Sequence, residues 1–323
     1  MAPLGDNARG ALWMMASMAG FVLNDTLMKS VAGEVALFQA IFLRGLIATA
    51  LIALLAWRRG ALAYVPRGPD RRLILYRMEG EIGGTSLFLT ALFNMPLANA
   101  TAIIQAAPLT VTLAAALFLG HSVGWRRYAA IGVGFVGVVL IVRPGGEGFN
   151  AYSLAALAAV LFMTLRDVST RGLSLSVPSL FVTVITSASI TAFAGIVTAF
   201  GDWRPVGWEA TGRLAGAAVL LLLGYYAGIV AMRVGEIGFV SLFRYTNLLW
   251  ALALGFAVFG DVPDWLTVAG AAIVAGTGLY TLHRERVTAR RAVRHARPAK
   301  PSRASAGCRD GERPAAPARR ERH

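Results

Sequence analysis

The most regular feature of the sequence is a succession of long apolar segments separated by short polar turns. Each segment is about 20 residues long, which is the length that a helix needs to cross roughly 30 Å of hydrocarbon. The pattern therefore predicts an all-α membrane protein with ten transmembrane helices, at residues 10–29, 35–57, 73–95, 98–120, 126–143, 152–171, 177–200, 212–233, 236–259 and 264–282.

An internal repeat divides these helices into two halves. Residues 98–142 align with residues 238–282 without a gap, at a constant offset of 140. Because each half holds five helices, an odd number, the second copy must enter the membrane in the opposite orientation, as in many secondary transporters. We therefore expect two inverted five-helix repeats, at 1–145 and 150–283, and a tail at 284–323. The identical positions are Gly120 and Gly260, Trp125 and Trp265, Leu109 and Leu249, and Ala129 and Ala269.

The composition agrees with a membrane protein and places most of the positive charge in the tail. The chain of 323 residues is 56% hydrophobic and has a mean hydropathy of +0.60. Of its net charge of +14, residues 283–323 contribute +9, and their Pro, Ala, Arg and Ser content predicts disorder. We interpret the tail as a cytoplasmic segment near anionic lipid, with binding of nucleic acid or a partner as the alternative. Cys308, the one cysteine, lies there, which excludes disulfides and cysteine-based metal sites from the membrane part.

The basic residues of the short loops predict the orientation of the chain, because Lys and Arg are retained on the cytoplasmic side. With the N-terminus inside, nine basic residues fall in inner loops and four in outer loops, so we expect both termini to be cytoplasmic. The inner residues are Arg58, Arg59, Arg67, Arg71, Arg72, Arg126, Arg127, Arg171 and Arg233, and the outer ones are Lys29, Arg143, Arg204 and Arg213.

Two i,i+4 pairs of opposite charge occupy equivalent helices of the two halves. At an offset of 142, Asp25 aligns with Asp167, and each acid precedes a cation, Lys29 or Arg171, by four residues. The two helices run in opposite directions, so one pair lies near the outer surface and the other near the inner surface. We interpret these residues as groups for gating or proton coupling; interfacial ion pairs are the alternative.

Several ionisable residues lie deeper in the predicted helices. Each would cost about 2.5–3.5 kcal/mol at a lipid-facing helix centre, so they must face the bundle interior, pair with one another or line a wet cavity. Intramembrane charge of this kind is by default a functional-site hypothesis. The residues are Arg44, Arg77, Glu79, Glu81, Arg166, Asp167, Glu236 and Arg244.

Arg77 and Glu81 are separated by four residues, beside the glycines of segment 80–84. Because glycine lets another helix or a ligand approach closely, this face is a candidate cavity wall, and a clasp that locks the helix to its neighbours is the alternative. Arg44 is expected to be buried against a carboxylate, either Asp25 or Glu81.

The helices at 98–120 and 236–259 carry hydrogen-bonding groups at equivalent positions. At the offset of 140, the segment with Gln105 and Pro108 aligns with the segment that holds Arg244, Tyr245 and Asn247. Such a pair of polar clusters is expected of a midplane binding site on a pseudo-twofold axis, and Pro108 permits a kink. The alternative is a helix bend whose polar groups tie helices together. The predicted substrate-binding residues are Arg44, Arg77, Glu81, Gln105, Arg244, Tyr245 and Asn247.

Motifs typical of enzymes and cofactors are missing or misplaced. Residues 132–137 match GxGxxG but lie inside an apolar helix without a preceding soluble strand. His121 is a lone loop histidine, and no Ser/His/Asp, paired-Cys or His-rich set occurs. We therefore expect no enzyme activity, no cofactor and no metal.

Several motifs resemble those of the EamA-type members of the drug/metabolite transporter superfamily, over residues 9–284. In the first half they run from Ala98-Asn99-Ala100-Thr101 through Pro108-Leu109 to Phe118-Leu119-Gly120, Gly124-Trp125-Arg126-Arg127, Gly134, Gly137 and Arg143-Pro144-Gly145. In the second half they run from Arg233-Val234-Gly235-Glu236 through Phe243-Arg244-Tyr245, Leu249-Trp250 and Phe259-Gly260 to Gly278-Leu279-Tyr280. The family usually has Glu at the two positions where this chain has His121 and Asp261. Since His121 is not an acid, a role for an acid at that position of the first half is in doubt.

The resemblance implies ten helices in two inverted repeats that carry a small organic solute across the inner membrane by alternating access. Phe243-Arg244-Tyr245 with Gly260-Asp261 resembles the branch with carriers of S-adenosylmethionine and riboflavin more than the amino-acid exporters. Mixed charges beside Tyr245 suit a zwitterionic or heteroaromatic metabolite. An exporter of amino acids, metabolites or drugs is the alternative, and a non-transporting protein that recruits a partner through its basic tail is an alternative of another class. The expected partners are the solute and the lipid bilayer, with a homodimer left open and no nucleic acid. Import, export and energy source stay open.

Overall fold

The computed structural model describes residues 5–118, 125–144, 150–174, 176–201, 203–234 and 236–296. Within these ranges the chain is helical, with an isolated bridge between Ala32 and Val35 and no named strand. Residues Met1–His283 form one compact unit and Arg284–His323 a second. Gly120, His121 and Cys308, about which the sequence makes predictions, lie outside the described residues.

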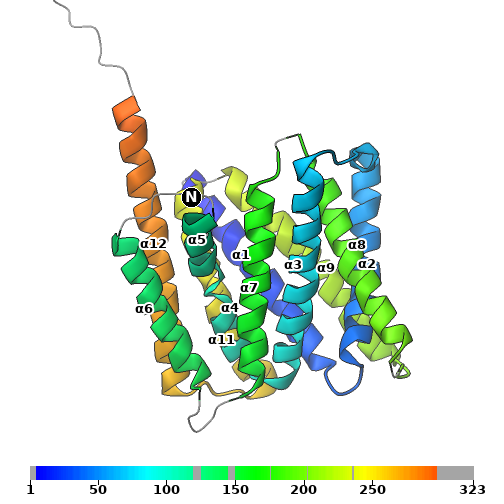
Figure 1. Cartoon of the computed structure of the whole chain (residues 1–323). Helices are drawn as coiled ribbons and strands as arrows, with labels where there is room; N and C mark the ends of the chain where they lie inside the picture. Colours follow the sequence, from blue (N-terminus) through cyan, green and yellow to red (C-terminus); the bar gives the residue numbers. More distant parts are fainter. Residues whose placement is uncertain are drawn as a thin grey trace, which may run out of the picture. The chain divides into compact units, whose positions relative to one another are not determined.

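The helices follow the predicted apolar windows, except that α12 extends beyond its window; Figure 1 shows how they are arranged. The first half contains α1 (Asp6–Ser30), α2 (Leu37–Arg58), the short 3₁₀ helix η1 (Ala61–Ala63), α3 (Pro69–Asn94), α4 (Leu97–Ile104), α5 (Ala107–Phe118) and α6 (Trp125–Val142). The second contains α7 (Tyr152–Arg171), α8 (Ser179–Ala199), α9 (Trp208–Val234), α10 (Ile237–Val240), the 3₁₀ helix η2 (Ser241–Tyr245), α11 (Thr246–Phe259) and α12 (Trp265–Ala296).

Seven helical segments of the described chain are long and apolar enough to cross a membrane, and two shorter apolar helices accompany them. The shorter ones are Tyr128–Val142 and Trp265–Thr281. Helix α3 is outside this set, and it carries Arg77, Glu79 and Glu81 along one stretch. Charge, rather than length, therefore distinguishes α3 from its neighbours.

Two of the predicted helices are interrupted at equivalent positions. The window at 98–120 breaks at Gln105 and Ala106, between α4 and α5, two residues before Pro108, which has no N–H to continue the helical ladder. The window at 236–259 tightens into the 3₁₀ helix η2, which ends at Tyr245. The sequence predicts the kink near Pro108. It does not predict the break at η2, because no proline lies there.

The ends of α11 and α12 differ in kind. Gly260 takes φ = 68° after α11, and the next residue, Asp261, donates its N–H to Gly255 O at 3.0 Å, so the helix stops there. Helix α12 instead continues to Ala296, past the predicted end at 282. Residues 283–296 contain Arg, Ala and Glu, which favour helix, and no Gly or Pro. Residues 297–323 of the tail lie outside the part of the chain that the structure describes.

Small residues let the helices pack closely in pairs. The Ser17 hydroxyl of α1 donates to the Gly224 carbonyl of α9 at 2.7 Å, and a Cβ on Gly20 would lie 3.2 Å from Gly224 Cα. Gly137 of α6 and Gly270 of α12 meet in the same way: a Cβ on either would lie within 2.8 Å of the other's carbonyl oxygen. Backbones that approach so closely are typical of small-residue interfaces between membrane helices.

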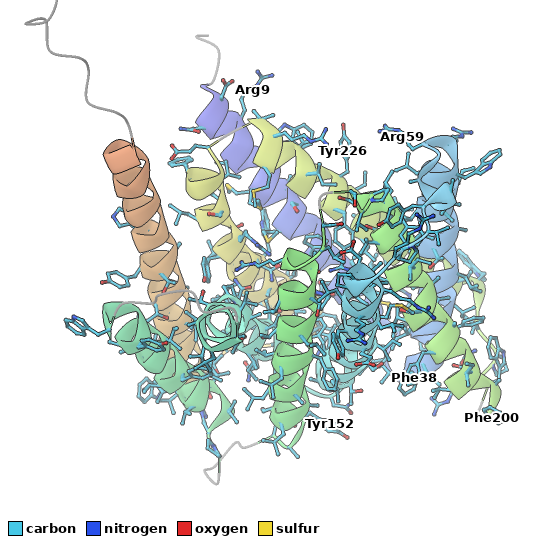
Figure 2. The ribbon with its side chains drawn as sticks, turned by 45° about the horizontal axis from the view of Figure 1, so that its top comes forward. Arg9, Phe38, Arg59, Tyr152, Phe200 and Tyr226 are labelled. Carbon is cyan, nitrogen blue, oxygen red and sulfur yellow. The ribbon has the colours of Figure 1, made fainter. Side chains whose placement is uncertain are left out.

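Polar contacts hold the two ends of the bundle. Arg9 and Arg59 mark one end in Figure 2, called here the N-terminal end, and Phe38, Tyr152 and Phe200 mark the opposite end. At the opposite end, the Gln39 side chain and the Arg204 backbone exchange two hydrogen bonds, of 2.7 and 3.2 Å. At the N-terminal end, the Ser174 hydroxyl and N–H donate to Asp70 and lower the pKa of its carboxyl.

Candidate functional site

A network of three charged side chains joins α3 to α7 inside the bundle. Arg166 Nη1 lies 3.3 Å from Glu81 Oε2, and Arg166 Nε donates to Asp167 Oδ1 at 2.9 Å. The Thr85 hydroxyl donates to the other Glu81 oxygen at 3.1 Å. Side-chain exposures of 17% for Glu81, 25% for Arg166 and 38% for Asp167 leave the network within reach of water or a solute. Asp167 forms no ion pair with Arg171, its predicted partner, which is exposed.

Arg77 and the glycines of α3 contact α7 and α8 rather than open space. Arg77 Nε donates to Thr186 Oγ1 at 3.2 Å, and Arg77 Nη1 donates to Thr170 Oγ1. A Cβ on Gly80 would lie 2.7 Å from the backbone N of Arg166. Helix α7 therefore packs directly on the glycine face, so the close approach predicted for these glycines is that of a helix.

Arg44 of α2 has an amide, not a carboxylate, as its partner. Arg44 Nη1 donates to Asn24 Oδ1 at 3.1 Å, while Asn24 Nδ2 donates to Asp25 Oδ1 at 2.9 Å. Neither of the expected partners, Asp25 and Glu81, forms an ion pair with Arg44. Asn24 therefore stands between a cation and an anion as a neutral spacer.

Tyr225 of α9 lies where these groups meet. Its ring packs edge-on against Phe21, with centroids 5.1 Å apart, and its side chain is 45% exposed. Since its neighbours come from α2, α3 and α7, Tyr225 faces across the bundle. The charged groups close enough to interact electrostatically with its hydroxyl are Glu81, Arg166, Arg77 and Arg44. We refer to these five residues together with Asn24, Asp25 and Asp167 as the central cluster.

Asn24 and Tyr225 were not predicted as site residues, although the repeat contains a signal for both. The offset of 142 that aligns Asp25 with Asp167 also aligns Asn24 with Arg166. In α3 and α9 an offset of 144 aligns Gly80 with Gly224, Gly84 with Gly228 and Glu81 with Tyr225.

Lys29 connects three helices at the opposite end of the bundle. Its Nζ donates to the carbonyls of Met95 and, at 3.3 Å, of Leu92 at the end of α3. The same Nζ lies 5.3 Å from the centroid of the Phe259 ring, close enough for a cation–π contact. Lys29 forms no ion pair with Asp25, because the carbonyls that end α3 draw the ammonium group away.

The remaining predicted residues lie at the two helix breaks. Gln105 is half-buried and makes no side-chain hydrogen bond to a described residue, and Arg244 is exposed. Tyr245 is buried against α12, where a Cβ on Gly278 would lie 1.6 Å from its hydroxyl oxygen. Asn247 Oδ1 is buried without a partner in the described chain. Of the predicted substrate-binding residues, the structure thus brings Arg44, Arg77 and Glu81 together in the central cluster. The other four lie at the helix breaks: Gln105, Arg244, Tyr245 and Asn247.

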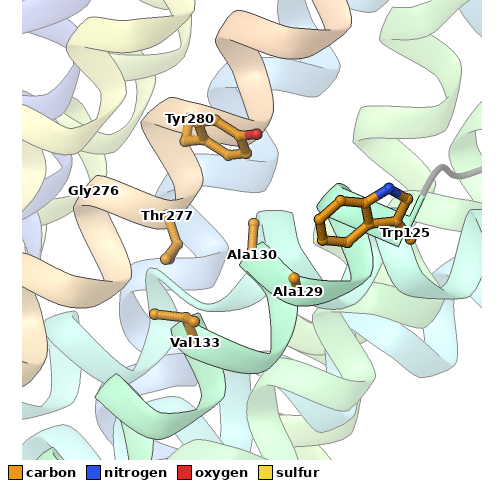
Figure 3. A pocket seen from close by; sticks show the side chains of 7 residues that line it. All are labelled: Trp125, Ala129, Ala130, Val133, Gly276, Thr277 and Tyr280. Atoms are coloured by element: carbon orange, nitrogen blue, oxygen red, sulfur yellow. The ribbon is translucent and has the colours of Figure 1, made fainter.

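A cavity of about 450 Å³ lies between α6 and α12, lined by apolar side chains from both helices (Figure 3). It contains no charged group, so it suits a lipid chain better than a charged solute. Its lining residues are Trp125, Ala129, Ala130, Val133, Gly276, Thr277 and Tyr280. Within the described residues, no group of three His, Cys, Asp or Glu side chains could hold a metal ion.

Long apolar helices that hold charged residues among themselves define a multi-pass membrane protein with a charged interior. Residues 8–143 match the EamA-like transporter family. The resemblance to EamA-type members of the drug/metabolite transporter superfamily is confirmed by this match and by relatives that are named as transporters.

Relatives named as transporters cover most of the chain. A riboflavin transporter of Vibrio cholerae is 27% identical, covering 82% of this chain and 90% of the relative. An S-adenosylmethionine uptake transporter of Rickettsia felis is 23% identical, covering 86% and 93%. The pseudopaline exporter CntI of Pseudomonas aeruginosa is 26% identical, covering 81% and 92%. A solved crystal structure shares the fold, with a TM-score of 0.59 at 20% identity, over 86% of this chain and 98% of that one.

Proposed function

We propose that the protein is a secondary transporter that moves a small zwitterionic or heteroaromatic metabolite across the inner membrane by alternating access. The observation that carries this proposal is the central cluster. It sets three arginines and three carboxylates among α1, α2, α3 and α7, with Tyr225 beside them. Intramembrane charges that are mutually compensated, partly accessible and beside an aromatic ring suit a solute with charges of both signs.

The packing of the helices supports ten crossings in two inverted repeats, at 1–145 and 150–283. If every helix is replaced by the equivalent helix of the other half, each main pair of packed helices becomes another pair that is also packed. Thus α1 with α9 becomes α7 with α3, α2 with α9 becomes α8 with α3, and α1 with α11 becomes α7 with α4 and α5. The pairs α2 with α8 and α4 with α11 exchange into themselves. A pseudo-twofold axis in the membrane plane would produce this exchange.

Both mouths of such a carrier need groups that close and release. Lys29, which links α1 to the end of α3 and to Phe259, suits a latch at the opposite end. Asp167 and Arg171 stand near the N-terminal end, and Asp25 and Asp167 are the candidates for proton coupling. The excess of basic residues in one set of loops supports cytoplasmic termini.

The proposal is tested by transport into proteoliposomes that contain the purified protein. The panel holds riboflavin, S-adenosylmethionine and amino acids, each measured for uptake and efflux with and without a pH gradient. We expect saturable transport of at least one zwitterionic or heteroaromatic compound above empty liposomes. Flux that equals that of empty liposomes for the whole panel would contradict the proposal.

A further inference from the structure

Arg44 is buried with most of its hydrogen-bonding capacity unused. Its side chain is 9% exposed, and its Nε has no partner in the described chain. A guanidinium offers five N–H donors, yet the one hydrogen bond that Arg44 makes to a described residue is from Nη1 to Asn24 Oδ1. A buried cation in this state is costly, because no carboxylate of the described chain lies in direct ion-pair contact with it and Asp25 and Glu81 act on it only at longer range.

The other two arginines of the central cluster have better partners. Arg166 holds the carboxylates of Glu81 and Asp167, and Arg77 donates to two threonine hydroxyls. Arg44 has only a neutral amide. An anion that reached Arg44 would therefore gain more there than at Arg166, whose charge is already compensated twice.

Asn24 hydrogen-bonds both to Arg44 and to Asp25, its neighbour on α1. Its amide oxygen accepts from Arg44, and its amide nitrogen donates to Asp25 at 2.9 Å. The two ends of one neutral side chain thus face a cation and an anion. A solute with a carboxylate and a cationic group matches the same two ends.

We infer that Arg44 is the binding site for the carboxylate of a zwitterionic solute, with Asp25 facing the cationic part and Asn24 holding the two apart. The inference rests on the proposed transport function and narrows its substrate class to carboxylate-bearing zwitterions. Guanidinium is suited to this task because its planar donors match the two oxygens of a carboxylate.

Thermal unfolding of the full-length protein in detergent measures binding without requiring transport. The probes are matched pairs that differ in the carboxylate: S-adenosylmethionine and its decarboxylated form, tryptophan and tryptophanamide, and methionine and methioninamide. We expect the acid of at least one pair to bind at least about tenfold more tightly than its counterpart. In Arg44→Gln the difference should disappear.

A second variant keeps the test decisive if Arg44→Gln does not fold. Asn24→Asp is nearly isosteric and places a carboxylate within reach of Arg44 Nη1, so it should remove the preference for acids by occupying the guanidinium. Arg59→Gln is the matched control, because Arg59 is exposed at the end of the same helix. This control should keep the preference.

The outcomes separate the two proposals. No preference for acids in the unmodified protein, or a preference that survives in Asn24→Asp or in folded Arg44→Gln, would overturn the Arg44 site. Preferential binding of an acid without transport in proteoliposomes would overturn the transport function and leave the Arg44 site standing.

Discussion

At the scale of single residues, the choice of partner decides what each buried charge can do. The guanidinium of Arg166 forms ion pairs with Glu81 and Asp167, whereas that of Arg44 forms a hydrogen bond with the neutral side chain of Asn24. Both arginines belong to the central cluster, but they pack against different helices, and the partners that those helices supply distinguish them.

Replacing Glu81 tests the charged network directly. Glu81→Gln removes the charge that faces Arg166 and leaves that arginine with Asp167 alone. We expect a loss of about 1–3 kcal/mol of stability, since the pair is only partly buried, and at least about tenfold slower transport with normal membrane expression. Thermal unfolding and initial transport rates measure the two effects.

The control for this change lies two residues away on the same helix. Glu79 is exposed, so Glu79→Gln should alter neither stability nor transport. Equal transport by the Glu81→Gln and unmodified proteins would remove Glu81 from the site.

At the scale of helices, glycine sets how close two of them can lie. The backbone of α7 fills the space beside Gly80, with Arg166 N and Phe162 O each 2.7 Å from where a Cβ would stand. This contact also positions Arg166 opposite Glu81, because the two charges belong to the helices that the glycine brings together. The glycine contact of α3 with α7 thus determines both how closely the two helices pack and where Glu81 and Arg166 meet.

Gly80→Ala should push α3 and α7 apart, because a backbone cannot move aside as a flexible side chain can. We expect a loss of about 1–3 kcal/mol, measured by thermal unfolding of the purified protein. Gly132→Ala is the matched control, since no atom of another described helix lies within 4 Å of its added Cβ. A Gly80→Ala protein as stable as the control would show that this interface tolerates separation.

The sequence predicts the helices far better than it predicts their contacts. Hydropathy gave the apolar windows to within a few residues, because the cost of exposing polar backbone to hydrocarbon is local to each segment. The 3₁₀ helix at Ser241–Tyr245 and the Asn24 partner of Arg44 were missed. Tyr225 was missed because it sits in an apolar run, where only the glycine register with α3 marks it. Partner choice depends on tertiary packing, which no periodicity encodes.

At the scale of the whole molecule, the unit Met1–His283 contains the central cluster and both helix breaks. The basic tail lies outside that unit. Transport and any recruitment of a partner through the tail are therefore assigned to different parts of the chain, and truncation can separate them.

Deleting residues 285–323 should leave transport unchanged, measured in proteoliposomes with equal amounts of full-length and truncated protein. A full-length variant with the tail Lys and Arg replaced by Gln controls for an effect of charge on membrane insertion. Loss of function in both variants, with normal insertion, would favour the alternative of a recruiting membrane protein.

Asn24 and Arg166 occupy equivalent positions in the two halves but differ in charge. This difference has an energetic consequence for the proposed transport cycle. A carrier with identical halves would hold its two open forms at equal free energy. Here Arg166 of α7 forms a three-charge network with Asp167 and with Glu81 of α3, whereas Asn24, at the equivalent position of α1, has a single amide link to Arg44, so this degeneracy is lifted. Every 1.4 kcal/mol of difference shifts the resting populations about tenfold. In the proposed alternating-access cycle, we therefore expect the empty protein to be open to one side more often than to the other, and its apparent affinities on the two sides of the membrane to differ accordingly.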